Sequence, residues 1–164
     1  MFNTALTAVS IGLVFVITFI VFSKSLFGLV VIGEREVGIV VRKFGPKLAA
    51  GQHVALKGEA GYQAATLSPG WHFGYYPWKF TVKKTAVVRI PQGQIGLIVA
   101  GDGATPPASR ILGCAVDCDS FQDARKFLMN GGEKGRQIDI LTAGVYRINT
   151  ALFSVIVAQN ADHR

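Results

Sequence analysis

The sequence predicts an α+β fold that is rich in β-strands, with an N-terminal transmembrane helix followed by two related small β modules. Three observations support it: an uncharged apolar N-terminus, an internal repeat, and one short helical pattern inside the second copy of the repeat. We expect an anchor over 1–25, a first module over 26–86 and a second module over 87–164, whose C-terminal end can be incomplete. The roughly 130 to 140 residues beyond an anchor match the usual size of one domain.

The anchor is predicted from a long uncharged segment. No charged side chain occurs from Met1 to Ser23, and Ala5–Phe22 is almost continuously apolar. Because roughly 17 to 25 residues of helix cross the hydrocarbon of a bilayer, we expect a retained single span. A cleaved secretory signal would need a basic N-terminal region and an A-x-A-like site, which are missing here, and a buried helix or re-entrant segment is the other alternative. Lys and Arg follow the segment and none precedes it, so the positive-inside rule places the domain on the cytoplasmic side of the inner membrane.

The internal repeat organises the rest of the chain. Ile32–Gly45 aligns with Ile90–Gly103 at an offset of 58 residues, and Gly61–Phe73 aligns with Gly135–Arg147 at an offset of 74. The second copy must therefore contain an insertion of about 16 residues, for which the polar stretch beginning near Asp117 is the natural candidate. Two degenerate copies are too few for a solenoid, so we expect two β modules packed together.

Strand patterns dominate the first module. Leu26–Ile32 and Val37–Val41 are rich in β-branched residues, and the charged ERE segment between them predicts a hairpin or a kinked edge. The sequence Ser68-Pro69-Gly70 suits a type II turn. Tyr62–Leu67 and Trp71–Tyr75 are therefore predicted to pair as strands on either side of it.

One short amphipathic helix is predicted inside the insertion. Ser120 would cap it, Asp123 follows three residues later, and Gly131 would end it. Its apolar positions are Phe121, Ala124, Phe127 and Leu128. We expect this helix to cover one face of the sheet.

The order of these motifs resembles the start of the SPFH (Band 7) superfamily, which includes stomatins, prohibitins, flotillins and HflK/HflC. The most specific part is Leu67–Phe73 with Pro77 after it, which resembles the L-x-P-G-x-H-F…P signature, and bacterial flotillin-like members look most similar. The resemblance covers Val30–Pro77 and, through the repeat, Ile90–Ile148. It implies a membrane-anchored scaffold subunit without catalysis or cofactor, which forms homo-oligomeric rings or cages that organise a membrane microdomain or enclose partner membrane proteins. The second half of the family domain and its coiled coil do not precede Arg164, so we expect the N-terminal part of a longer protein. The alternative is a short form that lacks the coiled coil through which family members assemble.

Two sets of residues are candidates for interaction. Six aromatic residues fall within 71–80, ahead of two lysines, and Trp, Tyr and Lys all favour the headgroup layer of a bilayer. The residues predicted to contact the leaflet are Trp71, Tyr75, Tyr76, Trp78, Lys83 and Lys84. The alternative is cross-strand aromatic packing in the core. The residues predicted at a charged seam between subunits are Glu34, Arg35, Glu36, Arg42 and Lys43, although a charged hairpin is usually just solvated.

Other function classes have weaker support. Residues 24–100 hold ten Lys/Arg against three Glu, but no nucleic-acid-binding motif accompanies this basic excess. The candidates for catalysis or metal binding are Cys114, Cys118, His53, His72 and the carboxylates around Asp117–Asp119. Cys-x₃-Cys is not a zinc-knuckle spacing, and no G-x-S-x-G or H-E-x-x-H string occurs. We therefore expect a protein that is not an enzyme and holds no metal, and the alternative to a scaffold is a small membrane-tethered domain that binds a protein partner or anionic lipid.

Overall fold

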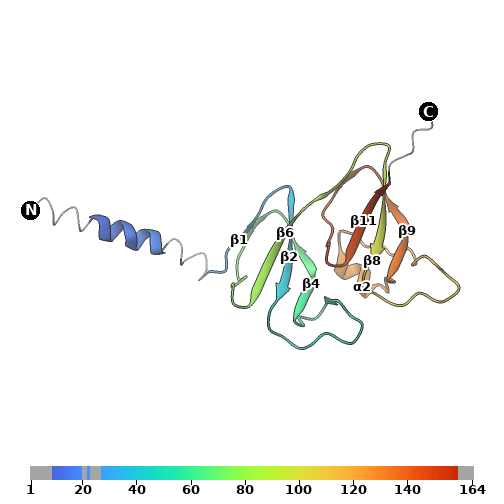
Figure 1. Cartoon of the computed structure of the whole chain (residues 1–164), viewed down its shortest axis with the longest axis horizontal. Helices are drawn as coiled ribbons and strands as arrows, with labels where there is room; N and C mark the ends of the chain where they lie inside the picture. The colour runs from blue at the N-terminus through green and yellow to red at the C-terminus, as the bar shows by residue number, and fades with distance from the viewer. Residues whose placement is uncertain (1–8, 20–21, 23–26, 159–164) are drawn as a thin grey trace, which may run out of the picture.

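The computed structural model describes residues 9–19, 22 and 27–158, and these form a β-rich fold in two halves (Figure 1). The first module contains β1 (Val30–Ile32), β2 (Glu36–Arg42), β3 (Val54–Ala55), β4 (Gly61–Leu67), β5 (Gly70–His72) and β6 (Phe80–Ala86). The second module contains β7 (Val88–Ile90), β8 (Ile95–Ala100), α2 (Ala124–Met129), β9 (Gly135–Leu141), β10 (Gly144–Tyr146) and β11 (Phe153–Ala158).

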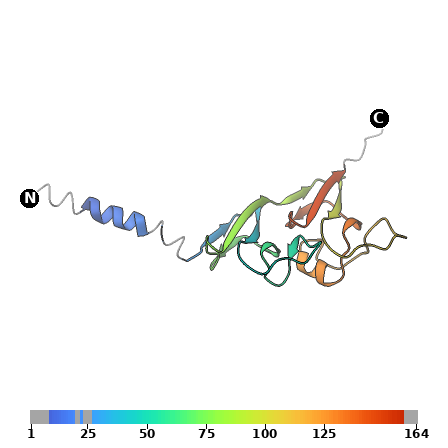
Figure 2. The same cartoon turned by 60° about the horizontal axis from the view of Figure 1, so that its bottom comes forward.

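Each module is built from one main sheet and one two-stranded ribbon. The main sheets have the strand orders β3-β4-β2-β6 and β11-β8-β9, and the ribbons are β1-β5 and β10-β7. The strand pairs are antiparallel except β3 with β4. The modules lie side by side, with α2 on the side of the second module that faces β4 (Figures 1 and 2).

The strand registers of the two modules repeat each other. Gly38 of β2 pairs with Leu67 of β4, and at the offsets of the sequence repeat Gly96 of β8 pairs with Leu141 of β9. The register irregularity in each pair also falls at the same place, just after these positions. The duplication is therefore present in the structure as well as in the amino-acid sequence.

The two glycines explain why each ribbon can cover its sheet. A Cβ atom added to Gly38 would lie 2.9 Å from Ile32 Cδ1, and one added to Gly96 would lie 2.5 Å from Ile90 Cδ1. Both contacts are closer than carbon atoms tolerate, so a larger residue would push the isoleucine of the ribbon out of the small core beneath it.

Side-chain hydrogen bonds also recur between the modules. Gln63 Nε2 donates to the carbonyl oxygens four and two residues earlier, at 2.8 and 3.0 Å, and Gln137 Nε2 does the same at 2.7 and 2.9 Å. The turn of each ribbon is closed in a similar way, because His72 Nε2 lies 2.8 Å from the carbonyl oxygen four residues earlier and Tyr146 Oη donates to the equivalent carbonyl at 2.9 Å. The glutamine contacts hold the chain at the start of β4 and of β9, and the His72 and Tyr146 contacts close the turns from β4 to β5 and from β9 to β10.

The insertion in the second module lies between Cys114 and Gly132. Ala55 is bridged to Gln63, and Gly113 is bridged to Gln137 at the equivalent position, so the alignment of the modules holds up to that point. The extra residues carry α2. Asp123 caps this helix, its carboxylate accepting from Lys126 N at 2.9 Å, so the prediction of Ser120 as the cap is wrong.

Ser120 does not cap the helix because the residues before the helix have left-handed backbone conformations. Asp119, Ser120 and Phe121 have φ angles of 54°, 51° and 63°, which non-glycine residues adopt at a cost of roughly 1–3 kcal/mol each. Phe121 is buried among core aromatic rings, and its burial holds this turn in place. Propensity rules cannot anticipate such a turn, since it exists only because of the tertiary contact.

The predicted pairing of Tyr62–Leu67 with Trp71–Tyr75 is also wrong. The strand β4 pairs with β2 and β3, whereas β5 pairs with β1, with Val31 opposite Trp71. Gly70, at a φ of +133°, redirects the chain into the second layer. There the ribbon buries Ile32 against Leu67, which a hairpin within one sheet would leave exposed.

The larger core joins the two modules. It is built mainly from the second module around the rings of Phe121, Phe127 and Phe153, whose centroids lie 5.0–6.1 Å apart. Val54 and Ala64 of the first module belong to the same cluster. The first module therefore contributes to the core of the second and does not pack only on itself.

The predicted transmembrane anchor over 1–25 is wrong. Among the residues that the structure describes, none lies in a helix long and apolar enough to cross a membrane. The described helical turns over 9–19 rise about 16 Å, whereas the hydrocarbon of a bilayer is about 30 Å thick. The remaining residues of the predicted segment, except Phe22, lie outside the described part. The predicted single-pass placement in the inner membrane, with a cytoplasmic domain, depended on this helix and is corrected with it.

Candidate functional site

The outer face of the main sheet of the second module is an exposed apolar surface. Ile140, Leu97 and Ile156 are direct neighbours across β9, β8 and β11, and all three are exposed. Ile138 lies on the same strand as Ile140 and is also exposed. These four residues, which we call the second-module apolar face, line a groove of about 430 Å³ together with Leu112.

The equivalent face of the first module is buried along its central strand. Val37 and Ile39 are 1% and 3% exposed, whereas their counterparts Ile95 and Leu97 are 37% and 40% exposed. Ala64 is 2% exposed, whereas its counterpart Ile138 is 56% exposed. Lys83, at the edge of this face, is exposed in the first module as well, so the face is partly covered in one module and bare in the other.

Contacts from the second module cover part of the first. Asn149, which is fully buried, donates from Nδ2 to the carbonyl oxygens of Gln63 and Ala64, both at 3.0 Å. Asp102 Oδ2 accepts from the backbone N–H groups of His53 and Val54 at 2.6 and 2.9 Å. Buried polar groups that are paired in this way fix the modules relative to each other, because leaving one unpaired would cost roughly 1–3 kcal/mol.

A second exposed surface lies on the ribbon of the first module. Val31 and Trp71 are cross-strand partners, and alternation places Phe73 on the same outer side; all three are exposed. We call these three residues the aromatic ribbon. At the equivalent pair of the second module, Arg89 faces Val145. The aromatic character is therefore specific to the first module.

The structure separates the residues that were predicted to contact a leaflet. Trp71 and Trp78 are exposed, and the Trp78 ring stacks on Tyr76 with centroids 4.9 Å apart. Tyr75 instead packs inward against Phe80, and burial raises the pKa of its hydroxyl. The lysines lie on β6: Lys83 Nζ donates to Tyr62 Oη at 2.7 Å, and Lys84 lies 3.9 Å from the carboxylate of Glu36.

The residues predicted at a charged seam do not form one group. Glu34 and Arg35 are exposed in the loop between β1 and β2. Arg42 donates to the carbonyl oxygens of Phe44 and Gly58, and Lys43 Nζ donates to that of Pro77 at 2.6 Å. Glu36 accepts from Gly33 N at 3.3 Å. Arg42, Lys43 and Glu36 thus have partners within the chain and hold the turns of the first module.

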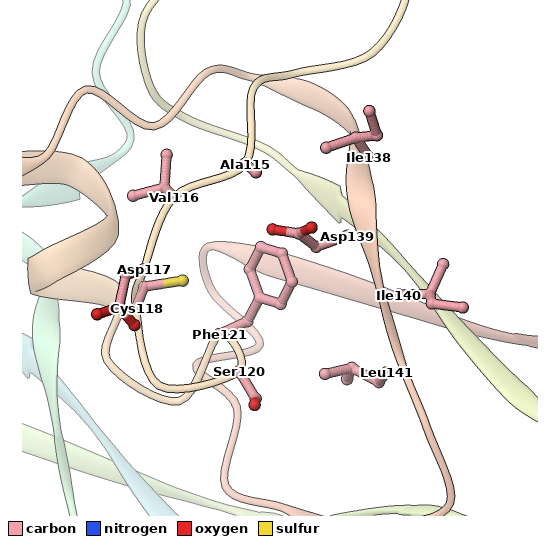
Figure 3. Close-up of a pocket in the computed structure, with 10 residues that line it drawn as sticks. All are labelled: Ala115, Val116, Asp117, Cys118, Ser120, Phe121, Ile138, Asp139, Ile140 and Leu141. Atoms are coloured by element: carbon pink, nitrogen blue, oxygen red, sulfur yellow. The ribbon is translucent and has the colours of Figure 1, made fainter.

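The residues considered for catalysis lie in different parts of the fold. A pocket of about 500 Å³ beside the insertion contains Cys118, whose sulfur points toward the Phe121 ring (Figure 3). Burial raises the pKa of the Cys118 thiol, and the negative charges of Asp117 and Asp139 raise it further, so a thiolate is disfavoured.

Within the described residues no side-chain hydrogen bond joins Cys118 to a histidine or to Cys114. His53 precedes β3, and His72 contacts Ser68 O from within β5, whereas Cys114 lies half-buried at the start of the insertion. Within the described ranges, no group of three or more His, Cys, Asp or Glu side chains is placed to hold a metal ion.

Comparison with protein-family models, curated proteins and solved structures found no match for this chain.

The second-module apolar face was missed at the sequence level, although a signal was present. Ile95–Ala100 and Gln137–Leu141 carry apolar residues at both odd and even positions. Such strands are typical of sheets that are covered on both sides. In this structure only one side is covered, so the pattern indicates a face that can accept another surface.

Proposed function

We propose that this protein is a non-catalytic scaffold subunit that associates with copies of itself. The observation that carries the proposal is the second-module apolar face, a row of exposed Ile and Leu side chains across three strands. Contiguous exposed apolar patches mark interaction sites, because each large apolar side chain gains about 1.5–3 kcal/mol on burial. The SPFH-like motif at Leu67–Phe73 supports the same class of function. We propose in addition that the assembly encloses partner proteins.

The test is the size of the full-length chain in solution. We expect sedimentation velocity to show species larger than dimers that grow with protein concentration, because association through apolar surfaces follows mass action. A single monomeric species at every concentration would contradict a scaffold function. It would leave a small binding domain as the remaining reading.

A second candidate function is contact with an anionic lipid surface, and the aromatic ribbon favours it. Trp and Phe side chains at the edge of a basic module suit the headgroup region of a bilayer without a spanning helix. The first module supplies most of the charge, since residues 24–100, which contain it, hold ten Lys/Arg against three Glu.

Vesicle binding tests this second candidate. We expect Trp71→Ser to weaken binding to phosphatidylserine-containing vesicles about tenfold, because a large apolar side chain contributes roughly 1.5–3 kcal/mol on burial. Trp78→Ser is the matched control, because Trp78 is an exposed tryptophan outside the aromatic ribbon. Both variants keep the N-terminal apolar segment, so its contribution to binding is the same in each. Equal binding by wild-type protein and Trp71→Ser would remove the aromatic ribbon from any lipid contact.

A further inference from the structure

We propose that a second copy of this chain docks on the second-module apolar face through the turn Tyr76–Lys79 of its first module, so that copies join head to tail. The inference deepens the proposed scaffold function and rests on it. It follows from the way in which the two modules of one chain already pack together.

Within one chain, a turn of the second module docks on β4 of the first. The turn is closed by Asn149 O, which accepts from Leu152 N at 3.0 Å and Phe153 N at 2.9 Å. Asn149 Nδ2 then reaches the carbonyl oxygens of Gln63 and Ala64. These carbonyls lie at the register irregularity of β4, where the regular ladder leaves them available.

The same turn exists in the first module. Tyr76 O accepts from Lys79 N at 2.9 Å and Phe80 N at 2.8 Å, in the pattern of the Asn149 turn. Phe80 and Phe153 are equivalent, since they begin the last strand of each module and pair with Arg42 and Ala100 respectively. The turn Tyr76–Lys79 is therefore the element that a second copy would present in the place that the Asn149 turn occupies within one chain.

Both halves of the proposed contact between chains are larger and more apolar than the equivalent residues of the contact within one chain. On the receiving strand Ala64 is replaced by the larger and more apolar Ile138. On the docking turn the polar Asn149 is replaced by Tyr76, which is stacked against the exposed ring of Trp78. A polar contact within the chain thus corresponds to an aromatic pair facing an apolar groove between chains. In the single chain Trp78 and the groove are exposed and Tyr76 is half-buried.

The receiving face is also more apolar than its counterpart in the first module. Ile140 occupies the position of Thr66, and Ile156 occupies the position of Lys83. The groove volume of about 430 Å³ lies within the range of roughly 300–1,000 Å³ that is usual for sites that hold ligand-sized groups. An aromatic anchor in an apolar pocket is the common arrangement at the centre of protein interfaces.

The proposed contact is asymmetric, because the docking turn belongs to the first module and the receiving face to the second. The receiving groove is lined mainly by apolar residues, with Arg136 as its charged residue. Asp139 alternates to the opposite side of β9 and lies with Asp117 in the pocket beside the insertion. Because head-to-tail copies leave a free face at one end and a free turn at the other, they form closed rings or open filaments.

Paired substitutions on each side of the contact test the inference, with association measured by sedimentation velocity. We expect Ile140→Asp and Trp78→Ser each to raise the dissociation constant about tenfold or more, as loss of a central anchor does. The matched controls are Val145→Asp, an exposed strand valine of the same module, and Trp71→Ser, and both should associate like wild-type protein. Thermal unfolding of each variant shows that it is folded, and Ile156→Lys replaces Ile140→Asp if that variant does not fold.

The possible outcomes separate the inference from the proposed function. If wild-type protein associates and either Ile140→Asp or Trp78→Ser has no effect, the head-to-tail contact is wrong while a scaffold function stands. If wild-type protein is monomeric, both fall. The chain has two tryptophans, so in Trp71→Phe the fluorescence comes from Trp78 alone. We expect its emission to shift to shorter wavelength as the protein associates, and an unchanged spectrum in associated protein would also overturn the inference.

Discussion

Phe127→Ala is expected to lower the free energy of unfolding by about 3–5 kcal/mol, the usual loss for a fully buried Phe. The side chain is 0% exposed and its ring contacts Phe121 and Phe153, with centroids 6.1 and 5.0 Å away. The residue lies on α2, within the extra residues of the second module. A loss of this size would show that the insertion is part of the core and not a surface addition.

Denaturant unfolding measures this effect, and the same helix provides the control. Met129 is exposed at the end of α2, so Met129→Ala should change the free energy of unfolding by less than about 0.5 kcal/mol. Equal losses for the two variants would mean that Phe127 contributes no more than helix propensity. The packing of the three rings would then not hold the second module together.

The second large effect is expected for Asn149→Asp. This substitution places a carboxylate against the carbonyl oxygens of Gln63 and Ala64 in a fully buried position, where it would lose both hydrogen bonds and repel two acceptors. An unpaired buried charge costs about 3–5 kcal/mol. The exposed Thr150 of the same turn is the control, and Thr150→Asp should have little effect.

The loss in Asn149→Asp should also depend on pH. Burial beside two carbonyl oxygens disfavours the charged carboxylate, so its pKa in the folded state lies above the value of about 3.9 in the unfolded chain. The loss of stability therefore grows as the pH rises from about 4 until it exceeds the pKa of the folded state, and it shrinks as the pH falls toward 4, where the protonated group can donate a hydrogen bond. Unfolding measured across this range checks the sign, and a loss that does not change with pH would mean that the turn moves away from β4.

The repeat could be identified from the sequence, because it preserves residues that the packing requires. Gly38 and Gly96 are retained where each ribbon approaches its sheet, and these positions set the alignment of the two copies. The sequence did not show which strand β5 pairs with. Alternation shows that Trp71 lies in a strand, but whether β5 pairs with β4 or with β1 depends on which arrangement buries Ile32.

The candidate site could be predicted only in part. Trp71 was correctly placed in a strand, but Tyr75 turns inward because Gly74, at a φ of +86°, interrupts the alternation after Phe73. The role of the second-module apolar face could not be read from its residues alone. It becomes apparent when Ile138 is compared with the buried Ala64, and that comparison requires the packing of both modules.

The mixing of two blocked variants tests head-to-tail assembly most directly. Ile140→Asp has a damaged receiving face and an intact docking turn, whereas Trp78→Ser has the reverse. At a concentration between the dissociation constants of the intact and the damaged contact, each variant should therefore be monomeric alone. Mixed together, they should form a one-to-one complex that sediments as a dimer and grows no further, because one intact turn meets one intact face. A mixture that stays monomeric would contradict head-to-tail assembly, since a symmetric contact damaged in both variants cannot be restored by mixing.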